Sequence, residues 1–218
     1  MEKKLRVKAI LLDLDGTVLD SRGAYLAAVK TAFAALGQET FEAASVMEIP
    51  KRLEQGLRID DLVSGLDVDR FLKVYLKAFY EATGVKSRPM PSVACALERL
   101  STRAMLAVTT MRYVPKSVVV AELERFGLAR FFRFVVTALD TDRPKPSPEG
   151  LVKCAMHFGV DARDCLVVGD SIMDVRAGKN AGVLTAGVLS GIFSREELER
   201  ENPDLILESV SLLPDFVE

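Results

Sequence analysis

Two pairs of aspartates in the sequence each follow a short apolar run. Asp13 and Asp15 come directly after Val7–Leu12, and Asp170 and Asp174 follow a second run. Residues two apart in an extended strand point to the same side, so Asp13 and Asp15 are expected on one face. Nearby carboxylates repel one another unless a cation or proton intervenes, and an all-oxygen ligand set favours Mg²⁺. The two pairs together predict a magnesium site.

Each pair taken alone has a simpler explanation. Asp15-Gly16 is a common turn sequence, and Asp170 or Ser171 at the start of a helix would serve as its N-cap. Four carboxylates at the carboxyl ends of strands would nevertheless repel one another without a cation. The combination is therefore more informative than either pair.

Two further residues complete a candidate phosphate site. Thr109 follows the run Met105–Val108 and offers a hydroxyl and a backbone N–H to a phosphoryl oxygen. Lys145 stands between prolines in residues 143–148, and its ammonium would offset both the carboxylates and a bound phosphate. A β-branched residue that ends a strand and a solvated loop lysine are the alternatives.

Short apolar runs alternate with helical patterns along most of the chain. The expected strands are Val7–Leu12, Met105–Val108, Phe134–Val136, Leu166–Val168, Leu184–Ala186 and Leu205–Leu207. The expected helices between them are Ser92–Leu100, Pro115–Phe126, Pro148–Phe158, Ser171–Ala181 and Arg195–Arg200. Most strands are continuously apolar, as in a parallel sheet covered on both faces. The pattern predicts an α/β fold with a doubly wound, mainly parallel, Rossmann-like sheet.

One stretch breaks this alternation. Between about residues 21 and 85 only helical periodicity is found, for example Tyr25, Val29 and Phe33, and residues 88–91 resemble a stiff linker. We therefore expect an all-α insertion. The predicted domains are an α/β core of residues 1–20 and 89–218 and a helical domain of residues 21–88.

The overall composition limits the possible partners. The chain has 218 residues, of which 29 are Lys or Arg and 31 are Asp or Glu, so a strongly basic nucleic-acid footprint is absent. No run approaches the roughly 18–20 apolar residues of a membrane span, and no exporting signal is recognised. We expect no nucleic-acid or membrane partner and a cytoplasmic protein, either a monomer or a homodimer.

The three cysteines are expected to be buried free thiols. Only four residues are Asn or Gln, which suggests a heat-adapted source.

The order of these features resembles the haloacid dehalogenase superfamily, specifically its phosphatases with a helical cap inserted after the first strand, such as the phosphoglycolate phosphatases. Four motifs carry the resemblance: Asp13-Leu14-Asp15-Gly16-Thr17, then Thr109, then Lys145, and finally Gly169-Asp170 with Asp174. The presence of Asp15 separates the chain from the superfamily's dehalogenases, which lack that acid/base aspartate.

The resemblance implies a role for each motif. Asp13 would be the nucleophile that forms an aspartyl-phosphate, and Asp15 would be the general acid and base. Mg²⁺ would be held by the Asp13 carboxylate, the Asp15 backbone carbonyl and Asp170, with Asp174 in support. Thr109 and Lys145 would hold the phosphoryl oxygens, and Gly16 and Thr17 would complete that phosphate site.

Two segments depart from the family pattern. The residue after Thr109 is commonly Asn, and here it is Thr110, followed two residues later by Arg112. We expect Thr110 and Arg112 to contact phosphate; a solvated loop cation is the alternative for Arg112. Residues 48–52 resemble the substrate-facing loop between cap helices, except that Glu48 stands where glycine is frequent. Lys51 and Arg52 would there meet an anionic substrate tail. A charged helix face is the alternative there.

The leading functional hypothesis is a Mg²⁺-dependent phosphatase that acts on a small phosphorylated metabolite. A sugar phosphomutase of the β-phosphoglucomutase type would use the same motifs to return the phosphoryl group to a sugar. A non-catalytic phospho-ligand-binding module is the third alternative, although binding alone needs no nucleophile.

Overall fold

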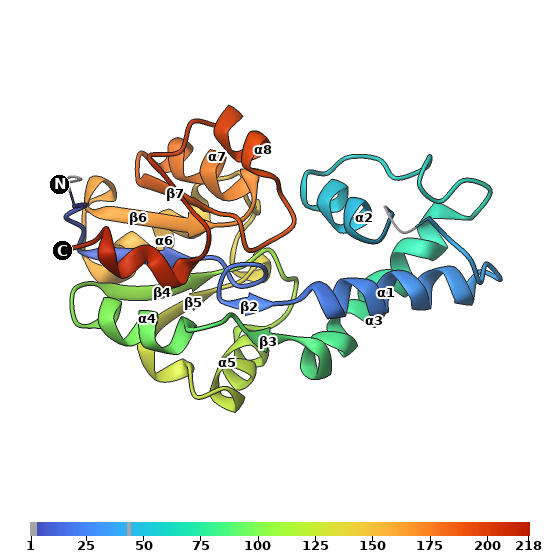
Figure 1. Cartoon of the computed structure of the whole chain (residues 1–218), viewed down its shortest axis with the longest axis horizontal. Coiled ribbons are helices and arrows are strands. Elements are labelled where there is room, and N and C mark those ends of the chain that lie inside the picture. Colours follow the sequence, from blue (N-terminus) through green and yellow to red (C-terminus); the bar gives the residue numbers. More distant parts are fainter. Residues whose placement is uncertain (1–3, 43–44) are drawn as a thin grey trace. The chain divides into compact units, whose positions relative to one another are not determined.

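A computed structural model of the protein describes residues 4–42 and 45–218 (Figure 1). The chain divides into two units, one that combines the residues up to Leu19 with Pro89–Glu218, and one formed by Asp20–Arg88. The first unit contains a six-stranded sheet, and the second contains helices.

The six strands of the large unit all pair in parallel. They are β1 (Ala9–Leu12), β4 (Met105–Thr109), β5 (Phe132–Val136), β6 (Cys165–Gly169), β7 (Leu184–Val188) and β8 (Leu205–Leu207), in the spatial order β5-β4-β1-β6-β7-β8. Since β1 lies between β4 and β6, the order reverses around β1, which is the position where open α/β sheets bind ligands. The predicted doubly wound parallel sheet is confirmed.

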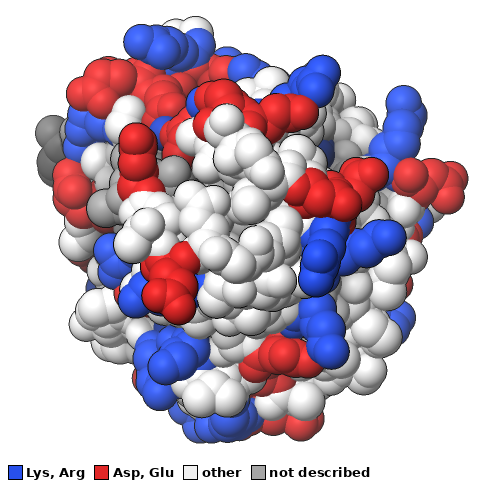
Figure 2. Space-filling view, turned by 90° about the vertical axis from the view of Figure 1, so that its right-hand side faces the viewer, with Lys and Arg blue, Asp and Glu red and all other residues white. Residues whose placement is uncertain are grey.

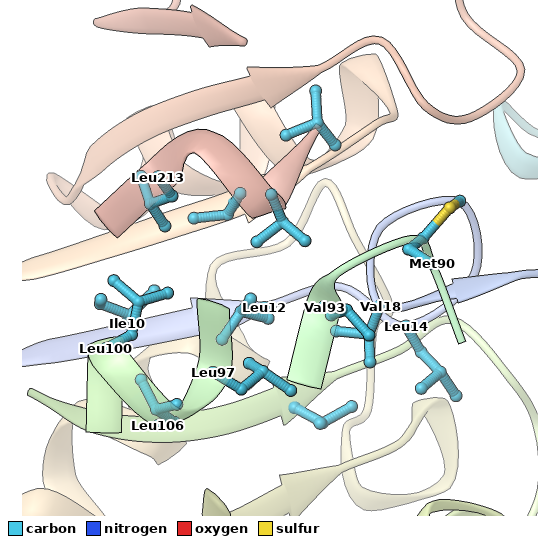
Figure 3. Close-up of a cluster of buried hydrophobic side chains, with 14 of the residues drawn as sticks. Ile10, Leu12, Leu14, Val18, Met90, Val93, Leu97, Leu100, Leu106 and Leu213 are labelled. Carbon is cyan, nitrogen blue, oxygen red and sulfur yellow. The ribbon is translucent and has the colours of Figure 1, made fainter. Parts of the chain in front are cut away.

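Helices cover both faces of this sheet. Successive side chains of β1 point to opposite sides and are all apolar, so each face of the sheet needs a covering layer. The helices are α4 (Val93–Ser101), α5 (Lys116–Arg125), α6 (Glu149–Phe158), α7 (Ile172–Ala181), α8 (Arg195–Arg200) and the short 3₁₀ helix η4 (Val210–Asp215). Ile10 and Leu12 of β1 join a cluster with Leu97 of α4 and Leu213 of η4 (Figure 3). Leu11 joins a separate cluster on the other face. Burial on both faces explains why the strands are continuously apolar.

The second unit consists of α1 (Arg22–Ala35), α2 (Ser45–Glu54) and α3 (Val68–Lys86). Aromatic side chains join α1 to α3: the rings of Tyr25 and Phe79 stack with their centroids 5.0 Å apart, and Phe33 meets Phe71 edge-on at 5.0 Å. Tyr25 and Phe33 are among the residues whose helical spacing predicted the insertion. No helix in residues 4–42 and 45–218 is long and apolar enough to cross a membrane.

Three local expectations were wrong. Residues 48–52 are not a loop but part of α2, where Arg52 pairs with Glu48 one turn earlier at 2.9 Å and with Asp61 at 2.6 Å. The expected linker contains the two-residue strand β3 (Arg88–Pro89), which pairs with β2 (Leu19–Asp20); so short a ladder leaves no alternation to detect. Cys95 is exposed, because it lies on the outer face of α4, whereas the other two cysteines are buried.

Acidic and basic side chains are interspersed around a largely uncharged area on the face drawn in Figure 2. Neither sign dominates that face, in keeping with the formal net charge of −2.

Candidate active site

The sheet register brings the sequence motifs to one edge. Leu12, the last residue of β1, pairs with Val108 of β4 on one side and with Val168 of β6 on the other. Asp13 continues β1, and its backbone N–H donates to the Val168 carbonyl at 2.8 Å. Thr109 therefore ends the neighbouring strand at the same level. The carboxyl ends of three adjacent parallel strands form the floor of the candidate site.

Three carboxylates meet on this floor. Asp13, Asp170 and Asp174 are buried, and one oxygen of each lies within 4.8 Å of the other two. Asp13 extends β1, Asp170 follows β6, and Asp174 stands in the first turn of α7. The two pairs of aspartates recognised in the sequence thus contribute three members to one cluster, whereas the side chain of Asp15 has other partners, described below.

Lys145 reaches this cluster from the segment after β5. Its Nζ donates to Asp13 Oδ1 and Asp174 Oδ1, both at 2.6 Å, and to the Thr109 backbone carbonyl at 2.8 Å. Burial by itself would lower the pKa of Lys145, but the charges of Asp13 and Asp174 outweigh burial and raise the pKa above its ordinary value. The lysine is therefore a permanent cation, not the solvated loop lysine of the alternative interpretation.

The cluster still carries more negative than positive charge. Burial raises the pKa of Asp13 well above its ordinary range; the ammonium of Lys145 opposes this, and the charges of Asp174 and Asp170 raise the pKa further. A second cation beside these carboxylates would stabilise Asp13 in its ionised form. Three converging carboxylate oxygens are hard ligands, so the donor set fits a divalent metal ion such as Mg²⁺ or Ca²⁺.

Local hydrogen bonds fix the orientation of Asp174. Ser171 Oγ accepts the backbone N–H of Met173 at 3.2 Å, and Asp174 Oδ2 accepts the backbone N–H of Ser171 at 3.3 Å, which together form a capping box at the start of α7. The alternative interpretation that Ser171 caps a helix is thus correct. It is also compatible with a metal site, because the cap leaves Asp174 Oδ1 for Lys145 and the cluster.

Asp170 is enclosed by two loops. Thr17 Oγ1 donates to Asp170 Oδ1 at 3.3 Å, and the Ile192 backbone N–H donates to Oδ2 at 3.3 Å. A β-carbon added at Gly16 would lie 2.5 Å from the Asp170 carboxylate, and one at Gly191 would lie 1.6 Å from its Oδ2. The structure therefore places Gly16 and Thr17 against a candidate metal ligand, a position that the phosphate assignment did not include.

The loop after β7 was missed by the sequence reasoning. Besides Gly191 and Ile192 it contributes Ser190, whose hydroxyl donates to the Gly16 carbonyl at 2.7 Å. The available signal was the small dipeptide Ser190-Gly191 shortly after an apolar run. The carboxyl ends of parallel strands share one edge, so this loop could have been assigned to the site by the rule that selected the aspartates.

Thr109 and Thr110 differ in their surroundings. The Thr109 hydroxyl is buried and has no hydrogen-bond partner among the residues that the structure describes, so it is available to a ligand. Thr110 Oγ1 instead accepts the backbone N–H of Arg112 at 3.2 Å, closing a local turn. The hydroxyl accepts in this turn, so it can still donate its hydrogen to a phosphoryl oxygen.

Arg112 is buried, and its guanidinium contacts two carboxylates. Its side chain is only 3% exposed, so it is not a solvated loop cation. Nε donates to Asp15 Oδ2 at 2.7 Å, Nη2 donates to Asp15 Oδ1 at 2.6 Å, and Nη1 donates to Glu122 Oε2. All three nitrogens thus donate to protein carboxylates, Asp15 and Glu122. Glu122 of α5 was not recognised from the sequence.

Residues 10–188 match the family model of the haloacid dehalogenase-like hydrolases. The chain belongs to this family. Its relatives include a phosphoglycolate phosphatase from Vibrio cholerae, 31% identical over 97% of both chains, and the pyrophosphatase PpaX from Bacillus velezensis, 30% identical over 94% of both.

Solved structures agree on the fold. A haloacid dehalogenase-like family hydrolase from Streptococcus pneumoniae superposes with a TM-score of 0.78 at 19% identity, over 94% of this chain and 95% of that one. The resemblance recognised from the motifs is confirmed, and the protein is a hydrolase of the phosphatase branch. This assignment contradicts the third hypothesis, that the protein is a non-catalytic phospho-ligand-binding module.

Proposed function

We propose that this hydrolase is a Mg²⁺-dependent phosphatase that cleaves a small phosphorylated metabolite through an aspartyl-phosphate on Asp13. The observation that supports the proposal best is the separation of the two motif aspartates. Asp13 lies in the carboxylate cluster beside Lys145, while the side chain of Asp15, two residues later, is held by Arg112. Two carboxylates with different cationic partners suit two different roles, nucleophile and acid/base.

In the first step an Asp13 oxygen attacks phosphorus while the bond from phosphorus to the leaving oxygen breaks. Asp15 gives its proton to that leaving oxygen. Lys145 holds the attacking carboxylate in place, and the unpartnered Thr109 hydroxyl donates to a phosphoryl oxygen. Binding and charge neutralisation supply most of the rate in phosphoryl transfer, and this site provides both.

In the second step water attacks the aspartyl-phosphate. Asp15, now a carboxylate, takes a proton from the water, the bond between phosphorus and Asp13 breaks, and inorganic phosphate leaves. Asp13, Asp170 and Asp174, with the backbone carbonyl of Asp15, would hold Mg²⁺. When bound, the ion neutralises charge on the phosphoryl oxygens.

The helical unit is proposed as the cap that selects the substrate. Cap closure would exclude water from the first step. Lys51 and Arg52 are the two cations proposed to meet an anionic substrate tail there, and Arg52 also pairs with Glu48 and Asp61. Phosphoglycolate and pyrophosphate are the first substrates to test, because one relative is named a phosphoglycolate phosphatase and another a pyrophosphatase.

The test is a panel of phosphate esters and pyrophosphate, assayed for released phosphate with Mg²⁺ and with EDTA, for the wild type and Asp13→Asn. We expect hydrolysis only with the metal and loss of at least about 10³-fold in kcat for Asp13→Asn, since a missing nucleophile cannot be replaced by positioning alone. Activity that survives in Asp13→Asn would overturn the mechanism. Isomerisation of a sugar phosphate without phosphate release would favour the mutase.

A further inference from the structure

We propose that Arg112, anchored by Glu122, is a positioning residue that orients the carboxylate of Asp15 for proton transfer to the leaving group. The inference rests on the proposed function, in which Asp15 is the acid and base. It assigns Arg112 a role through Asp15 instead of through the substrate, and it adds Glu122 of α5 to the residues on which the reaction depends.

The geometry of the pair fixes the plane of the Asp15 carboxylate. Arg112 donates two hydrogen bonds, 2.7 and 2.6 Å long, one to each oxygen. The side chain of Arg112 is 3% exposed and that of Asp15 is 10% exposed, so solvent competes little for either group. A bidentate pair of this kind restrains rotation of the carboxylate as well as its position, which one ammonium could not do.

Arg112 is itself held at both its ends. Its backbone N–H donates to Thr110 Oγ1 at 3.2 Å, and its carbonyl accepts the backbone N–H of Ala138 at 3.1 Å. At the other end of the side chain, Nη1 donates to Glu122 Oε2. The guanidinium is therefore fixed before any substrate arrives, and its orientation is passed on to Asp15.

The side chain of Glu122 is more buried than that of a glutamate on a solvent-exposed helix face. Its side chain is 7% exposed, whereas Glu124, two residues later on α5, is exposed. Carboxylates are seldom buried unless they are paired, and Glu122 pairs with Arg112 and, at 3.8 Å, with the more exposed Arg125. Burial raises the pKa of Glu122, and the charge of Arg112 opposes the rise.

These pairs form a chain of alternating charge that runs from the surface to the site: Arg125, Glu122, Arg112 and Asp15. Asp13 and Asp15 thereby receive separate cations, Lys145 and Arg112. A cation shared between the two aspartates would couple the nucleophile to the acid. Separate cations allow Asp15 to be aimed at the leaving oxygen while Asp13 stays aligned with phosphorus.

The test compares substrates that differ in their need for a general acid. p-Nitrophenolate departs without protonation, whereas an alkoxide does not. The first variant is Arg112→Lys, which keeps the positive charge but cannot donate the two parallel hydrogen bonds to Asp15. The second is Glu122→Gln, which keeps the shape of the side chain that holds Arg112 but removes its charge. Glu124→Gln on the exposed side of the same helix is the matched control.

We expect Arg112→Lys to lower kcat/KM for an alkyl phosphate about 100-fold, the lower end of a general acid's contribution, and kcat/KM for p-nitrophenyl phosphate less than about tenfold. The ratio kcat/KM is compared because it reports the steps up to formation of the aspartyl-phosphate, whereas the later attack by water uses Asp15 for both substrates. Glu122→Gln should show the same selectivity with a smaller loss, and Glu124→Gln should match the wild type.

Equal losses of kcat/KM on both substrates, or a rise in KM with unchanged kcat, would overturn the positioning role and assign Arg112 to phosphate binding. Full activity of Arg112→Lys on the alkyl phosphate would also overturn the positioning role, since the bidentate hydrogen bond to Asp15 would then be unnecessary. Failure of the proposed function itself gives a different result, namely activity that persists in Asp13→Asn. Circular dichroism of each variant verifies that the folded fraction is unchanged.

Discussion

Replacing Lys145 with methionine tests the electrostatic account of the site through stability, without any assumption about the substrate. Methionine keeps the length and much of the volume of the side chain but removes the ammonium that bonds to Asp13 and Asp174 at 2.6 Å. Removing one partner of a buried ion pair costs about 3–5 kcal/mol, because the remaining charges lose their compensation. For a chain of this length, that loss lowers the Tm by about 6–20 °C in EDTA.

Two conditions should reduce the loss. A divalent ion can replace the missing positive charge, so Mg²⁺ should raise the Tm of Lys145→Met more than that of the wild type; binding at 100 times Kd is worth about 2.7 kcal/mol. Lower pH should have the same effect. Lys145 opposes the raised pKa of Asp13, so its removal raises that pKa further, and protonation of Asp13 as the pH falls through the folded value relieves the repulsion.

The assay is thermal unfolding of both proteins at pH 8 and pH 5, each in EDTA and in Mg²⁺. Lys153→Met is the matched control, because Lys153 pairs with Glu149 at 2.9 Å but is 44% exposed, and it should lose less than about 1 kcal/mol. Equal Tm values for Lys145→Met and Lys153→Met, or a loss of stability in Lys145→Met that is the same at both pH values, would contradict a charge-compensating role of Lys145.

Further predictions concern thiols, glycines and thermal stability. Cys95 should react with a thiol reagent in the native protein at pH 8, whereas burial raises the pKa of Cys165 to about 11 and of Cys154 to about 12, leaving about 0.1% thiolate or less and no reaction before unfolding. Gly191→Ala should weaken Mg²⁺ activation in a metal titration, because its β-carbon would overlap a carboxylate oxygen of the cluster. Gly84→Ala, in open space within α3, should instead stabilise the protein by about 0.5–1 kcal/mol in urea unfolding. If the scarcity of amides reflects heat adaptation, the Tm should exceed about 55 °C.

Much of the fold and the polar floor of the site could be predicted from the sequence. Continuously apolar runs alternate with helical patterns, which indicates a covered parallel sheet, and the carboxyl ends of such strands meet at one edge. For this reason Asp13, Thr109 and Asp170 could be brought together without coordinates. Their position in the chain, directly after a strand, already determines their position in space.

Residues away from strand ends could not be placed in this way. Glu122 and Glu124 are two residues apart on one amphipathic helix, and only packing shows that the first is buried against Arg112. The family resemblance suggested a loop at residues 48–52, but α2 continues through them, Pro50 included. Arg112 lies in a loop, where spacing says nothing about the direction of a long side chain.

The sequence by itself determined which groups could carry the chemistry and at which edge of the sheet they gather, because strand ends are marked locally and the carboxyl ends of parallel strands share one edge. Only the tertiary structure decided which cation serves which carboxylate. Arg112 and Asp15 are 97 residues apart in the chain, and a charged side chain is buried only where packing supplies a partner. That choice depends on how the elements pack around the site, and no local pattern in the sequence records it.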